Sequence, residues 1–235
     1  MNELTRYSVI HEKCPREIVL LRGTGCKWRK CSFCDYHLDS HPDNESNFIL
    51  NSKVLDNVTG VYGEIEVINS GSMADLDSDT IELIKERCIQ KEIHTIHIES
   101  HWMHRHQIMK AKDEFKESGI TLKSKIGLET FDYDYRENVL IKGINEHDPA
   151  VIARYFDEAN LLQGVSGQNI EMLKTDIELG LKYFERICIN IMTPNSMPVK
   201  PDAKLTHQLA KEVYPQYINN DRVDILMNNT DFGVG

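Results

Sequence analysis

Three of the six cysteines in the chain lie within a single short segment. Cys26, Cys31 and Cys34 are spaced C-x4-C-x2-C in GTGCKWRKCSFCDYH. Thiolates at this spacing can face one metal centre, and three of them leave one coordination position open. Closed structural sites take four ligands, whereas a centre that activates a small molecule needs a free position. The spacing therefore predicts a metal centre that accepts a further ligand.

Two other centres also fit this spacing. A zinc site could use His37 as its fourth ligand. A [2Fe-2S] ferredoxin site would need Cys88 or Cys188, but we expect these to be buried thiols in a helix and a strand. A non-catalytic zinc or iron–sulfur electron carrier therefore stands as the alternative from a different functional class.

Short apolar runs rich in β-branched residues alternate with amphipathic segments along the chain. They predict strands at 17–23, 64–70, 93–100, 121–129, 161–167, 186–192 and 223–228. Helices are predicted over 78–91, capped by Ser78, over 104–118, closed by Gly119, over 168–184, and after Pro201 in a first turn.

This alternation predicts βαβ units and a parallel sheet. Six or seven units fall short of a complete eightfold barrel, so we expect an α/β fold, a partial (β/α)6 barrel with outer helices. One domain should cover 1–235, with its core at about 17–228. Function is expected at the carboxyl ends of the strands, where the βα loops gather.

The composition narrows the choice of partners. A formal net charge of -10 gives a surface that repels phosphate backbones and anionic membranes. The one dense basic run, Lys27 to Lys30, lies inside the cysteine segment and could offset a cluster's negative charge. No apolar stretch approaches the ~20 residues that span a bilayer. We therefore expect a soluble, cytoplasmic protein with a small-molecule substrate, and neither nucleic acid nor membrane as a partner.

The cysteine segment resembles that of the radical S-adenosylmethionine (SAM) superfamily. Its members place three cysteines after the first strand of a partial barrel, with an aromatic residue before the last one. Phe33 precedes Cys34 in the same way. The usual family spacing is C-x3-C-x2-C, so this chain has one extra residue between Cys26 and Cys31.

Three further motifs follow successive predicted strands. They are INSGSM at 68–73, HIES at 97–100, and IGLET at 126–130 followed by RENVLIKGI at 136–144. Their order resembles the lyases that process 7-deazaguanines, including the archaeosine-forming lyase of archaeal tRNA and the queuine lyase of bacterial queuosine salvage. The resemblance covers roughly 17–145. It implies that the SAM amino group lies at Ser70, Gly71 and Ser72, and the SAM ribose at Glu129.

The resemblance also implies cofactors and a reaction. A [4Fe-4S] cluster on Cys26, Cys31 and Cys34 would reduce SAM to a 5′-deoxyadenosyl radical, with a flavodoxin or ferredoxin as electron donor. Because the radical abstracts the hydrogen atom, we nominate no catalytic side chain. The reaction implied is cleavage of queuine to 7-aminomethyl-7-deazaguanine. The alternative within the superfamily is another small molecule such as a purine analogue.

The substrate site is predicted from residues late in the chain. A deazaguanine presents two adjacent donors, which a carboxylate accepts best. The C-terminal segment 223–235 offers Asp231, with Asn228 and Asn229 as amide partners and Phe232 to stack on the base. Candidates for the diol are Asn190, Thr193 and Asn195. Among the clustered histidines, His94 and His97 occupy outward strand positions, and only His101, after the strand end, is assigned to the site.

Overall fold

The computed structural model describes residues 4–235, which form two compact units. Of these residues, unit 1 holds 4–29, Tyr36–Lys125 and Phe232–Gly235, and unit 2 holds Lys30–Asp35 and Ile126–Asp231. The chain therefore enters unit 2 briefly through the cysteine segment and returns to unit 1 at its end. The prediction of a single domain stays a prediction.

Unit 1 is built on five strands. These are β1 (Tyr7–Ile10), β2 (Arg16–Leu21), β3 (Glu64–Asn69), β4 (Thr95–Glu99) and β5 (Thr121–Glu129), whose last residues belong to unit 2. β1 pairs antiparallel with β2, and each later pair is parallel. The carboxyl ends of β2 to β5 therefore point the same way, which gathers the loops that carry the predicted motifs.

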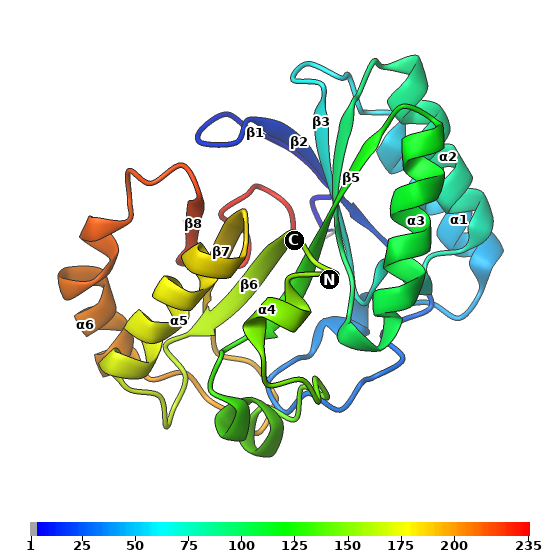
Figure 1. The fold of residues 1–235 in the computed structure, drawn as a ribbon. Coiled ribbons are helices and arrows are strands. Elements are labelled where there is room, and N and C mark those ends of the chain that lie inside the picture. The colour runs from blue at the N-terminus through cyan, green and yellow to red at the C-terminus, as the bar shows by residue number, and fades with distance from the viewer. Residues whose placement is uncertain (1–3) are drawn as a thin grey trace. The chain divides into compact units, whose positions relative to one another are not determined.

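Three helices cover one face of this part of the sheet. They are α1 (Asn44–Leu55), α2 (Ser78–Gln90) and α3 (Arg105–Glu117), which run beside β2 to β5 in Figure 1. Residues of the strands alternate in character because successive side chains point to opposite faces. Ile65 and Val67 are buried apolar residues, whereas Glu64 and Glu66 alternate with them. Unit 1 thus has an apolar face and a polar face.

Unit 2 continues the same pattern. Strands β6 (Glu158–Gln163), β7 (Arg186–Ile191) and β8 (Val223–Leu226) pair in parallel, and helices α4 (Pro149–Ile152), α5 (Ile170–Tyr183) and α6 (Ala203–Glu212) lie between them in the chain. Figure 1 shows α5 and α6 beside these strands. Within each unit, the order of strands in the sheet is the order of the chain. No helix among residues 4–235 is long and apolar enough to cross a membrane.

The predicted elements are present, with local corrections. Helix α2 is capped by Asp77, whose side chain accepts from the Thr80 amide, and not by Ser78. Pro201 forms an isolated bridge with Val165 before α6, which begins after the cap Asp202. β6 begins and ends earlier than predicted. Gly119 does close α3, with a positive φ of 76°. β1, α1 and α4 were not predicted.

Candidate active site

The first part of the cysteine segment lies against the loop that follows β3 in unit 1. The Thr24 amide donates to the Asp75 carbonyl at 3.0 Å. A Cβ on Gly23 would lie 2.5 Å from that carbonyl oxygen, and one on Gly71 would lie 3.1 Å from the Cys26 nitrogen. Only glycine allows these approaches. The backbone of Cys26 therefore lies beside Gly71, a residue predicted to bind SAM.

The second part of the segment is held within unit 2. The Ser32 amide donates to the Leu140 carbonyl at 3.0 Å, and the Val199 amide donates to the Ser32 carbonyl at 3.2 Å. The Asn195 side-chain amide donates to the Phe33 carbonyl at 2.8 Å. Asn195, predicted to bind the diol, thus serves to fix the loop between the second and third cysteines.

The cysteines of the segment have the character of metal ligands. Cys26, Cys31 and Cys34 form no disulfide bond and are partly exposed. Burial by itself would lower the pKa of Lys142, but Glu129 and the thiols of Cys31 and Cys34 raise this pKa above its ordinary value. The positive charge of Lys142 would offset the negative charge of thiolates that bind a metal. The donor set therefore fits an iron–sulfur cluster.

The loop after β3 contains buried acceptors without a partner. The Asn69 side chain donates to the Ser72 carbonyl at 3.1 Å, and the Asp75 carboxylate accepts from the Ser72 amide at 2.8 Å. Among the described residues, Oδ1 of Asn69 and Oδ1 of Asp75 are buried without a hydrogen bond. Burial raises the pKa of Asp75. Such acceptors are costly unless a donor meets them, and a ligand's amino group would supply one.

Sequence reasoning placed SAM at Ser70, Gly71 and Ser72 but missed Asn69 and Asp75. Both could have been found, because they flank the SGS segment in NSGSMAD. Ser70 and Ser72 are buried, and the hydroxyl of Ser72 accepts from the His101 amide at 2.9 Å. The loop therefore offers small residues for close approach and two buried acceptors for an amine.

Glu129 ends β5 in a strained conformation. Its φ is 71°, a region that residues with a Cβ seldom adopt, and its side chain is 9% exposed. The Lys142 ammonium donates to Glu129 Oε1 at 2.6 Å. A Cβ on Gly127 would lie 2.8 Å from Lys142 Nζ. A buried, strained carboxylate at a strand end is typical of a binding position.

Arg136 and Glu137, also part of the motif after β5, have a structural role. Arg136 is 1% exposed, and its guanidinium donates to the carbonyls of Thr130, Ile144 and Glu146. Glu137 accepts from the amides of Gly143 and Ile144. These bonds close the loop over 130–146, which positions Lys142 beside Glu129.

His101 lies beside the SGS loop in unit 1. It is 7% exposed, and its ring stacks on Trp28 with centroids 5.7 Å apart. Its Nδ1 accepts from the Met103 amide at 3.2 Å. His101 therefore connects the basic run of the cysteine segment with the predicted SAM loop. Its role in binding substrate stays a prediction.

The residues nominated to bind the base form a turn in unit 2. Asp231 is exposed, and its carboxylate accepts from the backbone amide of Asn228 at 2.9 Å and from its side chain at 3.3 Å. Asn229 is exposed and donates to the Thr193 hydroxyl at 3.3 Å. Asp231 therefore closes its own turn in this structure, and its role in binding the base stays a prediction.

Phe232 and Asn190 have surroundings of their own. In unit 1, Phe232 packs against a core cluster of Ile10, Ile18 and Val234, and the Arg16 guanidinium lies 5.1 Å from its ring centroid. In unit 2, Asn190 is partly exposed on β7. Packing gives Phe232 a structural role in this structure, and stacking on a base stays a prediction.

Buried charges on the polar face were not predicted. In unit 1, Glu66 is 2% exposed; it accepts from Arg16 at 2.6 Å and also from Lys125. In unit 2, Arg186 donates to buried Asp224 at 2.7 Å. His97, predicted as an outward residue, is 4% exposed and lies on the same face as Glu66. On these strands, the residues between the apolar ones are therefore polar and buried as well.

We predict that Glu129→Ala weakens SAM binding by about 1.5–3 kcal/mol, or roughly 10- to 150-fold, because a charged acceptor is lost. The measurement is calorimetric titration of SAM into protein reconstituted anaerobically to equal iron content. Glu171→Ala is the control, since that side chain is 82% exposed on α5. An unchanged dissociation constant in Glu129→Ala would remove Glu129 from the site.

Comparison with known proteins identifies the family. Neither the protein-family models nor the curated proteins give a match. Among solved structures, the chain is similar to the queuine lyase from Clostridium spiroforme bound to SAM and queuine. The two are 42% identical with a TM-score of 0.95, over 99% of this chain and 100% of that one. This similarity confirms the predicted partial-barrel fold. The chain belongs to the queuine lyase family of the radical SAM superfamily.

Proposed function

We propose that this chain is a radical SAM lyase that cleaves the bond between the cyclopentenediol and the amine of queuine. The product would be 7-aminomethyl-7-deazaguanine. The observation that carries the proposal is the full-length similarity to a queuine lyase whose structure holds both SAM and queuine. The two chains are 42% identical over 99% of this chain and 100% of that one.

Cys26, Cys31 and Cys34 would hold the [4Fe-4S] cluster, with SAM at the remaining iron. When bound, this centre supplies the electron that cleaves SAM, and the resulting 5′-deoxyadenosyl radical abstracts a hydrogen atom from the substrate. The protein's own contribution is then to bind, orient and exclude water. Lys142 supports this assignment, because its positive charge next to Cys31 and Cys34 would offset the negative charge of a thiolate-bound cluster.

Residues of unit 1 would bind the amino group of SAM, and residues of unit 2 would bind its ribose. In unit 1, the acceptor atoms Oδ1 of Asn69 and Oδ1 of Asp75 would take the amino group, and Gly71 lets the backbone approach it. In unit 2, Glu129 would accept from the ribose hydroxyls, with Lys142 fixing one of its oxygens.

Recognition of the base requires a carboxylate, and Asp231 is our nominee. In this structure it closes a turn with Asn228, so binding would exchange these hydrogen bonds for those of the base. Asp224, buried and paired with Arg186, is the carboxylate in unit 2 against which Asp231 should be compared.

We expect Asp231→Asn to lower queuine turnover, because one acceptor becomes a donor and leaves an unpaired group worth about 1–3 kcal/mol, or roughly 5- to 150-fold. Slow SAM cleavage without substrate should persist. The measurement is 7-aminomethyl-7-deazaguanine formed per hour by Asp231→Asn, Asp224→Asn and the unaltered enzyme. If only Asp224→Asn loses turnover, the carboxylate that recognises the base is Asp224 on β8 and not Asp231.

An external electron donor, a flavodoxin or a ferredoxin, would supply the electron. Lys27, Arg29 and Lys30 lie within the cysteine segment, and Arg29 has a positive φ of 45°. A local basic group on an acidic protein attracts an acidic donor. The proposal does not include a nucleic acid partner, since the base itself is the substrate.

The proposal is tested by anaerobic incubation of the reconstituted enzyme with SAM, a reductant and queuine, followed by mass spectrometry. The expected result is 7-aminomethyl-7-deazaguanine together with 5′-deoxyadenosine. Reactions without queuine, or with Cys31→Ala, are the controls. If SAM is cleaved but queuine stays intact while another 7-deazapurine is consumed, the superfamily assignment holds and the substrate is wrong.

A further inference from the structure

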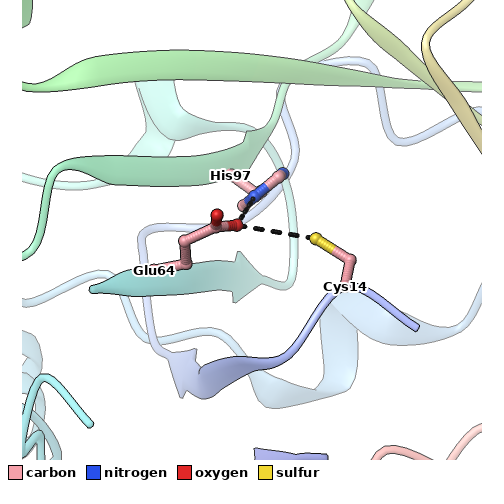
Figure 2. A group of neighbouring side chains, drawn as sticks. All are labelled: Cys14, Glu64 and His97. Carbon is pink, nitrogen blue, oxygen red and sulfur yellow. Dashed lines mark hydrogen bonds and ion pairs between the residues drawn. The ribbon is translucent and has the colours of Figure 1, made fainter. Parts of the chain in front are cut away.

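A second group of metal-binding side chains lies in unit 1, apart from the cysteine segment. Cys14 precedes β2, Glu64 is the first residue of β3, and His97 lies within β4. Figure 2 shows the three side chains pointing toward one another from these elements. Residues far apart in the sequence therefore converge on one point.

The register of the sheet explains this convergence. Glu64 pairs with Thr95, so His97 stands two residues further along β4 and on the same face as Glu64. The Arg16 guanidinium donates to the Cys14 carbonyl at 2.7 Å, which fixes the backbone that carries the thiol. The three side chains are thus held by strand pairing and by a hydrogen bond from a buried arginine.

The two printed distances from Glu64 match the spacing of ligand atoms around one zinc ion. Glu64 Oε2 lies 3.2 Å from His97 Nε2 and 3.5 Å from Cys14 Sγ, and all three atoms lie within 4.8 Å of one another. Ligands at about 2.0–2.3 Å from zinc, at the tetrahedral angle, lie about 3.3 Å apart for nitrogen and oxygen and about 3.5 Å apart for sulfur and oxygen. Two of the three pairs of ligand atoms are therefore already at the spacing that zinc requires.

Charge and burial also suit a dication. The side chain of His97 is 5% exposed and that of Glu64 28%, so the group is largely but not fully shielded from water. A thiolate, a carboxylate and a neutral imidazole together carry two negative charges, which a divalent ion neutralises. Sulfur and nitrogen ligands favour zinc over magnesium or calcium, which prefer oxygen alone.

The site is separate from the predicted cluster. Cys14 stands before the amino end of β2, and the cysteine segment begins after its carboxyl end. A six-residue strand at about 3.3 Å per residue places these ends roughly 20 Å apart. Cys14 therefore cannot ligate the same centre as Cys26.

We propose that Cys14, Glu64 and His97 bind one zinc ion, with a fourth position left to water or another small ligand. Three protein ligands and one open position are the arrangement of zinc sites that interact with small molecules. The proposal is independent of queuine, because it rests on this geometry alone and its test does not use turnover.

The test is the metal content of the full-length enzyme, reconstituted anaerobically and freed of loosely bound ions with a chelator. Element-resolved mass spectrometry should find about one zinc per chain together with about four irons, the iron content showing that the cluster cysteines are filled. Cys14→Ser and His97→Asn should each reduce zinc at least about tenfold and keep the iron. Substitution by Co²⁺ should give a thiolate-to-cobalt charge-transfer band that Cys14→Ser lacks.

Two variants control for unspecific loss. Exposed His94 lies just before β4, and Cys88 is a buried thiol on α2, so His94→Ala and Cys88→Ala should keep the zinc. Far-ultraviolet circular dichroism checks the fold of each variant. If a site variant fails to fold, the zinc content and the cobalt spectrum of the unaltered chain test the zinc proposal by themselves. Zinc below about 0.1 per chain at full iron content, or a cobalt adduct without the charge-transfer band, would overturn the proposal.

Discussion

Cys31→Ala is expected to abolish both cluster assembly and turnover. In a radical SAM cluster no other protein ligand can replace a lost cysteine, because SAM occupies the position that the three cysteines leave open. Iron per chain should therefore fall to a small fraction of that in the unaltered protein, and queuine cleavage should drop by a factor of about 10³ or more, since the uncatalysed reaction offers no other route. Iron and sulfide quantitation after anaerobic reconstitution, with product analysis on the same sample, measures both effects.

Cys88→Ala is the matched control for this loss. Cys88 is buried on α2, and burial raises the pKa of its thiol to about 12, so it is a poor metal ligand. The variant should keep its iron and its activity. Should Cys88→Ala lose the iron while Cys31→Ala keeps it, the ligand assignment is wrong and a ferredoxin-type site, with Cys88 as its fourth ligand, becomes the better interpretation.

Glu66→Gln is expected to have the largest effect on stability. Its carboxylate stands between Arg16 and Lys125, whose side chains are 2% and 5% exposed. Removal of this buried anion deprives two buried cations of their shared carboxylate, which costs about 3–5 kcal/mol of unfolding free energy. Denaturant unfolding followed by circular dichroism, at equal iron content, measures this loss.

The effect of Glu66→Gln should depend on pH with a defined sign. Burial alone would raise the pKa of Glu66, but Lys125 and Arg16 lower it well below its ordinary 4.5. A lowered pKa stabilises the fold fully above the unfolded value and less as pH falls below it. The difference between variant and unaltered protein should thus be full at pH 7 and shrink below about pH 4.5.

Glu82→Gln is the control for Glu66→Gln, because it removes an exposed ion pair where the other removes a buried one. Glu82 pairs with Lys85 on α2, and its side chain is 64% exposed, so its removal should change the unfolding free energy by less than about 1 kcal/mol. An equal effect of the two substitutions would contradict the role given to the buried charges.

The alternation of apolar strands with capped helices was sufficient to predict the fold class. Ile65 and Val67 on β3, and Ile96 and Ile98 on β4, are buried at every second position because one face of each strand packs against helices. The same pattern gives a wrong prediction at His97, because the positions between the apolar ones are buried too. β1 was missed because it is short and its pairing with β2 is antiparallel.

The site was predictable only where residues are adjacent in the sequence. The cysteine spacing and the SGS and IGLET motifs are local, and they led to the family that the structural similarity confirms. Lys142 beside Glu129 depends on the loop that Arg136 closes, and the Cys14, Glu64 and His97 group depends on strand register. Neither arrangement has a local signal. Asp231 was nominated from its position after the last strand, which cannot reveal that it closes its own turn.

The positive φ of Glu129 has a consequence for engineering this enzyme. A left-handed backbone favours glycine or asparagine, so a search for stabilising substitutions guided by stability alone would replace Glu129. The gain in folding free energy would remove the carboxylate assigned to the SAM ribose. Stability and cofactor affinity therefore compete at this one residue, and a thermostable version of the protein must find its gains elsewhere.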